Sequence, residues 1–323
     1  MKSVITTTIP LRNAQAFVQE TLQSVARQTR RPDRVVVLDN CSTDDTPQIV
    51  QAFKGLPLEY IRNPRDLGPF GNFNRCLDFA ADTEYLQILH GDDLIAPEFY
   101  EVMTRHLEDC SGRGMGWCLD ERIDEKGQRL SVSGKPNGAA HALEQDEFLA
   151  RKAEIGNQAF CGTLLKTNRQ ATPERFPEDM PILGDMVFWP KYGAHCQKIV
   201  TVNLILAKYR WHGSNETVFR APGIQALIAD EWRTMQQVEA LRGNHSGLLR
   251  QLKLKGLMAV RSGIKAKRVR QLGNRSYARE IVKTATGYTG WPLWMAGQAL
   301  VELRELLVFK LGRRPRHPQN IFS

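Results

Sequence analysis

The order of apolar runs along the first hundred residues restricts the fold of this chain more than any other feature. Three β-rich runs, at residues 4–9, 34–38 and 85–89, alternate with segments of helical periodicity, and a weaker run lies at 58–61. Strands that alternate with helices are typical of βαβ units, whose strands form a parallel sheet. We therefore predict an α/β fold with a mainly parallel sheet flanked by helices.

The segments between these runs carry the spacing and the end signals of helices. Residues 14–28 place Phe17, Val18, Leu22 and Val25 on one face. A cap residue and a proline at 43–47 predict a second helix that extends to residue 53, and two more are expected at 72–81 and 97–107.

After residue 110 the alternation stops. The segments 111–116 and 131–140 are rich in Gly, Ser and Asn, so we expect long loops beside the sheet there, suited to a lid over a ligand. The loops between 111 and 180 are expected to form the walls of the binding pocket and so to select its ligands.

The C-terminal third differs from the rest in both periodicity and charge. The chain has 323 residues, a length typical of about two domains. From residue 224 the pattern is helical, and between Arg250 and Arg316 there are 16 Lys and Arg against 3 Asp and Glu, whereas the whole chain has a net charge of +9. We expect a first domain over residues 1–220 and a basic, mostly helical region over 221–323.

Cysteine usage and the N-terminal segment bear on the compartment. The six cysteines are widely spaced without a Cys-x-x-Cys pair, which speaks against a zinc finger and fits reduced thiols. No apolar leader follows Met1, and no run of 18 apolar residues occurs. We expect a cytoplasmic protein, with peripheral attachment to the inner face of the cytoplasmic membrane left open.

Polar side chains follow several of the predicted strands at the point where each strand ends. Asp39-Asn40 follows the second run, His90-Gly91-Asp92-Asp93 the run at 85–89, and Gly184-Asp185 the apolar residues 180–183. Ligands of open α/β sheets bind at the carboxyl ends of the strands. Adjacent carboxylates repel, and a divalent cation such as Mg²⁺ or Mn²⁺ removes that cost while binding phosphate oxygens. The alternative for Asp92-Asp93 alone is a solvated, helix-capping turn.

Five segments together resemble the family 2 glycosyltransferases with the GT-A fold. They are VITTTIPLRNA, VVVLDNCSTDDT, RDLGPFGNFNRCLDFA, EYLQILHGDDLIAPE and ILGDMVFW. They occur in the family's order and at its usual spacing, over about residues 3–215. The chain lacks the P-loop pattern, and G-x-G-x-x-G is missing after the first strand, so neither a P-loop nor a dinucleotide site is expected.

The resemblance implies a role for each matching position. The residues expected to contact the nucleotide are Thr8, Pro10, Asn13, Asp39, Asn40, Gly68, Asn72 and Asp92. Asp93 and His212 are the expected ligands of Mn²⁺ or Mg²⁺, Arg210 the diphosphate contact, and Asp185 the general base. Asn40 departs from the acidic residue that is common in the family at this position. The identity of the nucleobase that the site binds therefore stays open.

The implied reaction is an inverting transfer from a UDP- or dTDP-sugar to a hydroxyl of a glycan or lipid-linked acceptor, in bacterial surface-polysaccharide biosynthesis. One alternative is a sugar nucleotidyltransferase, which needs a Gly-rich loop bearing Arg or Lys after the first strand; TTTIPLRNA fits this poorly. The other is a catalytically silent nucleotide-sugar-binding protein, since a fold does not prove activity.

The basic C-terminal region leaves its partner open. Residues 250–283 carry 11 Lys and Arg against one Glu, and 291–311 are amphipathic with Trp291 and Trp294 as candidate anchors. These features suit an anionic membrane surface. They also suit a helical region that packs its apolar face on the catalytic part. Few aromatic residues interleave the charges, so we expect no nucleic-acid partner.

Overall fold

The computed structural model describes residues 3–153, 160–180, 182–213, 223–243, 247–271 and 273–310. The chain forms two compact units. Unit 1 comprises Met1–Arg151, Gln158–Glu178 and Phe188–Phe219, and unit 2 comprises Lys152–Asn157, Asp179–Val187 and Arg220–Ser323. Two short segments from the middle of the chain thus belong to the same unit as the C-terminal region, and our division at residue 220 remains a proposal.

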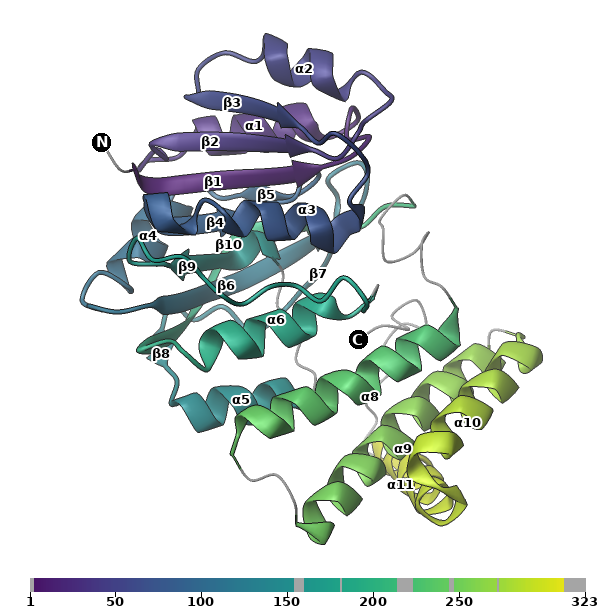
Figure 1. Ribbon diagram of the computed structural model, residues 1–323. Helices are drawn as coiled ribbons and strands as arrows, with labels where there is room; N and C mark the ends of the chain where they lie inside the picture. Colours follow the sequence, from purple (N-terminus) through teal and green to yellow (C-terminus); the bar gives the residue numbers. More distant parts are fainter. Residues whose placement is uncertain are drawn as a thin grey trace. The chain divides into compact units, whose positions relative to one another are not determined.

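Unit 1 is built on one ten-stranded sheet (Figure 1). Its strand order is β3 (Leu58–Arg62), β2 (Arg34–Asp39), β1 (Ser3–Leu11), β4 (Thr83–Ile88), β9 (Thr163–Lys166), β6 (Gly114–Ile123), β10 (Lys198–Arg210) and β5 (Leu94–Ile95). Two further strands pair outside this order, β7 (Arg129–Val132) with β6 and β8 (Ala140–Ala142) with β10.

The four strands from the predicted β-rich runs are adjacent and parallel. β1 lies between β2 and β4, with Thr8 paired to Val36 on one side and to Ile88 on the other, and β3 pairs parallel to β2. Because these strands run in one direction, their carboxyl ends meet at one edge of the sheet. This arrangement confirms the predicted α/β class and gathers the segments after β1, β2 and β4.

The rest of the sheet is mixed, so our expectation of a mainly parallel sheet holds only for this half. β9 is antiparallel to both β4 and β6, and β10 is antiparallel to β5 and β8 but parallel to β6. The expected loops were also wrong in part: β6 begins within 111–116, and β7 and β8 cover both ends of 131–140. The glycines there serve close packing, since a Cβ on Gly116 would lie 3.1 Å from Met103 Cε.

The apolar residues 180–183 do not form a strand. Of this segment, residues 182 and 183 form a turn that leads into helix α6 (Gly184–Gly193), and residue 181 lies outside the described residues. Asp185 therefore lies in the first turn of a helix, where we had expected it to follow a strand.

Four helices form close to where the sequence predicted them. They are α1 (Val18–Ala26), α2 (Thr46–Ala52), α3 (Gly68–Leu77) and α4 (Phe99–Arg105). Helix α5 (Gln145–Ala153) was not predicted and lies where we expect loops. Short 3-10 turns lie at Ala80–Asp82 and Phe160–Gly162. Figure 1 shows α3 in front of the sheet and α1 behind it. The apolar face of α1 packs with Phe99, Tyr100 and Met103 of α4 in the main core.

Unit 2 contains four long helices, as the sequence of this region predicted. They are α8 (Ile224–Leu241), α9 (Leu248–Gln271), α10 (Arg275–Thr289) and α11 (Trp291–Lys310). Helices α9 and α11 approach closely, because a Cβ on Gly297 would lie 2.7 Å from the Cβ of Ala259. No helix among the described residues combines the length and the apolarity needed to cross a membrane. Residues 311–323, which end the basic stretch, lie outside the described residues.

Candidate active site

Asp39, the last residue of β2, is a buried carboxylate with a full set of donors. Its Oδ1 accepts a hydrogen bond from the backbone N–H of Ser42 at 2.9 Å. Its Oδ2 accepts from the Tyr60 hydroxyl at 2.6 Å and from the Arg62 guanidinium at 2.7 Å. These bonds fix the turn after β2, so Asp39 orders the expected nucleotide end of the site.

Asn40 joins this turn to the start of α3. Its Nδ2 donates to Asp66 Oδ1 at 2.7 Å, and its Oδ1 accepts from the Leu67 N–H at 2.9 Å and from Asn63 Nδ2 at 3.0 Å. An aspartate at position 40 would have no proton to donate and would face the Asp66 carboxylate. The structure thus gives a local reason for the departure from the family's acidic residue. The Nδ2 also donates to the carbonyl of Gly68 at 3.3 Å.

The other predicted nucleotide contacts divide into buried and exposed residues. Thr8 and Pro10 of β1 are buried, and Asn72 of α3 is buried with its Nδ2 donating to the Leu38 carbonyl at 2.9 Å. Asn13 is exposed, with a φ of 50°, and its Oδ1 accepts from the Thr43 N–H at 2.8 Å. Of these residues, only Asn13 has a side chain exposed for direct contact with a nucleotide. The buried residues stabilise the backbone around it.

Asp93 follows β4 and is fully buried, but its pairing is incomplete. Its Oδ1 accepts from the backbone N–H of Arg210 at 2.9 Å. The thiol of Cys161 lies beside the carboxylate, yet no described residue donates a hydrogen bond of normal length to Oδ2. Burial raises the pKa of Asp93 well above its ordinary value, the charge of Asp92 raises it further, and the Arg210 N–H lowers it. The neutral form is thus favoured until a cation arrives.

Asp92, Arg210 and His212 form a connected group around this turn. Asp92 Oδ2 lies 2.9 Å from Nε2 of His212, whose ring packs against Phe17 at 4.7 Å between centroids. Arg210 is buried, and its Nε donates to the carbonyl of Asp92 at 3.0 Å. Its other nitrogens donate to Glu20 Oε2 at 2.6 Å and to backbone carbonyls that include that of Glu125 at 3.2 Å.

Arg210 therefore supports the Asp92-Asp93 turn through its hydrogen bonds to both residues. These intramolecular hydrogen bonds occupy the guanidinium of Arg210. The structure therefore favours support of the turn over the expected contact with a diphosphate. Both the diphosphate role of Arg210 and the metal role of His212 remain predictions.

Three side chains at the end of β4 fit a divalent cation. One ligand atom each from His90, Asp92 and Asp93 lies within 4.8 Å of the others. Carboxylate oxygens suit Mg²⁺ and Mn²⁺, and the open oxygen of buried Asp93 is a second sign that a positive charge is missing. Sequence reasoning named both aspartates but gave His90 no role, although it lies only two residues before Asp92.

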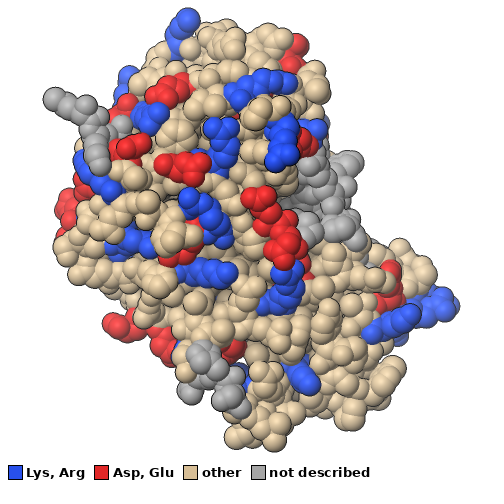
Figure 2. All heavy atoms as spheres, in the orientation of Figure 1, with Lys and Arg blue, Asp and Glu red and all other residues tan. Residues whose placement is uncertain are grey.

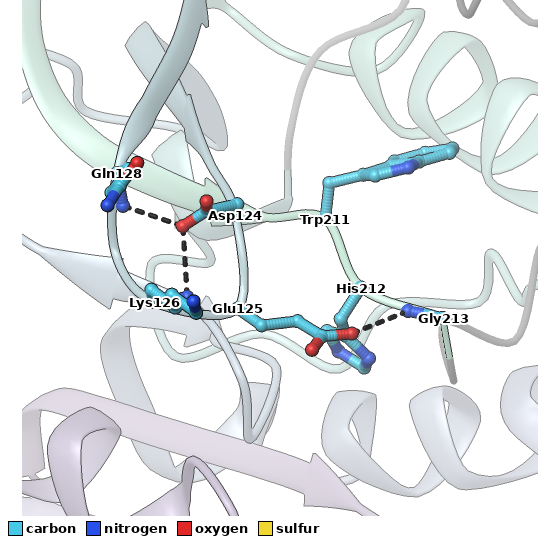
Figure 3. A pocket seen from close by; sticks show the side chains of 7 residues that line it. All are labelled: Asp124, Glu125, Lys126, Gln128, Trp211, His212 and Gly213. Carbon is cyan, nitrogen blue, oxygen red and sulfur yellow. Dashed lines mark hydrogen bonds between the residues drawn. The ribbon is translucent and has the colours of Figure 1, made fainter.

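A pocket of about 440 Å³ adjoins His212 (Figure 3). The turn between β6 and β7 and the end of β10 line it with Asp124, Glu125, Lys126, Gln128, Trp211, His212 and Gly213. Asp124 Oδ1 accepts from the N–H groups of Lys126 and Gln128, and Glu125 Oε1 accepts from the Gly213 N–H at 3.2 Å. This turn lies within the expected loops and was not predicted as part of a site, although the Asp124-Glu125-Lys126-Gly127 sequence is a turn signal.

Asp185, the expected base, belongs to unit 2. Burial raises the pKa of Asp185 to about 6, although the nearby charge of Lys152 lowers it. Lys152 is buried in the same unit, and burial lowers its pKa to about 7. A carboxyl group whose pKa lies near the working pH is suited to general base catalysis.

The surface of unit 1 offers no single-sign field on the face seen in Figure 2. Blue Lys and Arg side chains alternate there with red Asp and Glu side chains. Charges of both signs are thus mixed on this face, and the expectation of no nucleic-acid partner stays a prediction.

Residues 6–145 match the model of the family "Glycosyl transferase family 2". Among curated proteins, the chain is 32% identical over 110 residues to an uncharacterized protein of Mycobacterium tuberculosis, covering 34% of each chain. It is 25% identical over 147 residues to a GalNAc(5)-diNAcBac-PP-undecaprenol beta-1,3-glucosyltransferase of Campylobacter jejuni, covering 45% of each. The matches thus span less than half the length of these relatives.

Several solved structures resemble the chain over nearly its whole length. TarS of S. aureus, residues 1–349 in complex with UDP-GlcNAc, gives a TM-score of 0.58 at 16% identity and covers 97% of this chain and 93% of TarS. The mannosyltransferase PcManGT from Pyrobaculum calidifontis, in complex with GDP-Man and Mn²⁺, gives 0.51 at 17% identity, with coverage of 96% and 81%. The sheet, the strand-end site and these matches agree: residues 6–145 match glycosyl transferase family 2, and the fold is the GT-A fold.

Proposed function

We propose that this chain is an inverting glycosyltransferase that uses a nucleoside diphosphate sugar as donor. The observation that carries the proposal is the buried Asp93, whose open Oδ2 lies beside Asp92 and His90 at the end of β4. A diphosphate with its divalent cation would supply the charge that this group lacks. The nucleotide-sugar complexes of TarS and PcManGT support the same class of donor.

The reaction assigns distinct tasks to the residues. A Mn²⁺ or Mg²⁺ ion held by the Asp92-Asp93 turn would neutralise the charge that develops on the leaving diphosphate. Asp185 accepts the proton of the acceptor hydroxyl as its oxygen bonds to the anomeric carbon, a contribution on the order of 10²–10⁴-fold. The bond from that carbon to the diphosphate oxygen breaks on the opposite face, which inverts the anomeric centre.

The donor and acceptor are proposed at a finer level. We assign a UDP- or dTDP-sugar as donor, with Asn13, Asp39 and Asn40 at the base and ribose end. The acceptor is a hydroxyl of a glycan or lipid-linked glycan in bacterial surface-polysaccharide biosynthesis. Support for a lipid-linked acceptor comes from the Campylobacter relative, which carries an undecaprenol diphosphate acceptor in its name.

Attachment of unit 2 to an anionic membrane surface is part of the proposal. On α11, the large apolar side chains of Trp291, Met295, Leu300 and Leu303 are exposed. Basic residues Arg275, Arg279 and Lys283 are exposed along α10 at four-residue spacing. Trp294 is buried in the helical core, so only Trp291 of the two expected anchors faces solvent. Flotation with anionic vesicles tests this, since Trp291→Ser with Met295→Ser should reduce the bound fraction.

A combined binding and turnover assay tests the function. A preferred UDP- or dTDP-sugar should raise the melting temperature in the presence of Mn²⁺, because a ligand that binds the folded state stabilises it. Slow release of UDP or dTDP without acceptor should follow. Binding without any release indicates a silent binding protein, and formation of pyrophosphate from a nucleoside triphosphate indicates a nucleotidyltransferase.

A further inference from the structure

His90 is held at the cation site by the chain around it. Its Nδ1 lies 3.8 Å from Asp93 Oδ2. Cation–ligand bonds of about 2.0–2.1 Å place neighbouring ligand atoms about 3 Å apart. A small rotation of either side chain is therefore enough for both atoms to bind one ion.

The imidazole ring has little freedom to turn elsewhere. It stacks on Phe73 with 4.9 Å between centroids and an interplanar angle of 12°, and packs on Phe160 at 4.6 Å. Its Nε2 is buried without a hydrogen-bond partner among the described residues. Two aromatic rings thus fix a nitrogen-bearing ring beside two carboxylates, one of which also has an open oxygen.

We propose that His90 supplies a nitrogen ligand to the divalent cation and makes the site select Mn²⁺ over Mg²⁺. The inference rests on the proposed function, in which a cation binds at Asp92 and Asp93. Mg²⁺ takes oxygen ligands almost exclusively, whereas first-row transition ions accept imidazole readily. A site with only carboxylates would discriminate less. Packing against Phe73 and Phe160 alone, the competing role for His90, predicts no effect on ion choice.

The test measures ion binding without turnover, on the full chain with UDP as the nucleotide. Mn²⁺ is titrated by its free-ion EPR signal, and Mg²⁺ by competition. The wild-type chain should prefer Mn²⁺ over Mg²⁺ at least about tenfold more strongly than His90→Asp, which offers an oxygen in place of the nitrogen. Pulsed EPR of bound Mn²⁺ should show a ¹⁴N coupling that His90→Gln abolishes.

Two further variants locate the nitrogen. His212→Gln removes the other imidazole near the turn, the one that the resemblance makes a metal ligand. Because its Nε2 lies 2.9 Å from Asp92 Oδ2, assignment of the nitrogen ligand to His90 alone predicts that the ¹⁴N coupling remains in this variant. His141→Gln, at an exposed position of β8, is the matched control and should behave like the wild type. Thermal melts of each variant verify that the fold is intact.

The outcomes separate the two proposals. If Mn²⁺ binds but the coupling survives in His90→Gln or is lost in His212→Gln, the assignment of His90 is wrong and the proposed function stands. Unchanged ion preference in His90→Asp leads to the same conclusion. If the wild-type chain binds neither ion with UDP present, the cation site itself is wrong, and both proposals fall together.

Discussion

Asp39 and Asp93 are both fully buried carboxylates at the ends of strands that flank β1, yet their surroundings are opposite. Asp39 receives three hydrogen bonds, one of them from a guanidinium. Asp93 receives one bond from a backbone N–H, and its other oxygen faces a second carboxylate and a histidine. A buried charge is tolerated only when it is paired. We therefore interpret Asp39 as a structural residue and Asp93 as a candidate cation ligand.

Replacing each aspartate by asparagine should separate the two roles, with the largest effect expected in activity. Asp93→Asn should lower sugar transfer by at least about 100-fold, because several kcal/mol of transition-state stabilisation come from the cation. Without metal, this variant should be as stable as the wild type or more so, since the wild-type chain must either protonate this buried carboxyl group or bury its charge without a partner. Transfer rates and urea unfolding in EDTA measure both effects.

Asp39→Asn is the matched variant. It should lose about 1–3 kcal/mol of unfolding free energy, because Arg62, Tyr60 and the Ser42 N–H lose a charged acceptor. If Asp93→Asn proved the less stable of the two in EDTA, the contrast between scaffold and cation site would be wrong.

A substitution of Arg210 tests the same contrast through the hydrogen bonds that support the Asp92-Asp93 turn. Arg210→Lys removes the fork that joins Asp92, Glu20 and the turn after β6, and we expect a loss of about 2–3 kcal/mol in unfolding free energy. Mn²⁺ affinity should fall as well, since the turn that carries Asp93 loses its support. Calorimetry of Mn²⁺ binding below the melting transition measures this. An unchanged affinity with a lowered stability would limit Arg210 to a packing role.

Asp185 is an intermediate case, a half-buried carboxyl group on which the charge of Lys152 acts. Its pKa of about 6 predicts that transfer falls about tenfold per pH unit below pH 6, where the base is protonated. Lys152→Met removes a charge that lowers this pKa, so the inflection of the pH–rate profile should move upward. Lys152→Arg keeps the charge and should keep the inflection. A profile that is flat from pH 5 to 8 would remove Asp185 from the role of base.

Asn40→Asp should give the smallest loss of unfolding free energy. It tests the hydrogen bond between Asn40 and Asp66 in the turn after β2. The new carboxylate would lose the bond to Asp66 and repel it, for a cost of about 1–2 kcal/mol. Lowering the pH to protonate one of the pair should recover part of this loss. Thermal unfolding at pH 7 and pH 4.5 measures both, and Arg12, which pairs with Asp66 at 2.8 Å, gives the reason why the loss is moderate.

The elements that the sequence predicted correctly are those whose sequence patterns lie within a few neighbouring residues. The elements that were not predicted depend on packing between distant segments. β1 to β4 and the helices between them follow from apolar runs and caps within a few residues of one another, and parallel pairing then brings Asp39 and Asp93 to one edge. β6 carries glycines that read as turn residues in sequence but make room for Met103 and Leu107 in the structure.

The partners of the site residues were beyond the reach of the sequence. The bond from Arg210 to Glu20 joins residues 190 positions apart, and the stacking of His90 on Phe73 depends on how α3 packs on the sheet. The family match ends at residue 145, before Asp185, Arg210 and His212. The roles of these three therefore rest on resemblance and on the contacts described above.

Calorimetric binding of UDP with and without Mn²⁺ tests the central claim most directly. The claim is that the unpaired oxygen of the buried Asp93 carboxyl group binds a cation, which in turn binds the diphosphate. The account predicts at least about tenfold tighter UDP binding in Mn²⁺ than in EDTA, a gain that Asp93→Asn abolishes and Asp39→Asn retains in part. Equal UDP affinity in Mn²⁺ and in EDTA for the wild-type chain would contradict it.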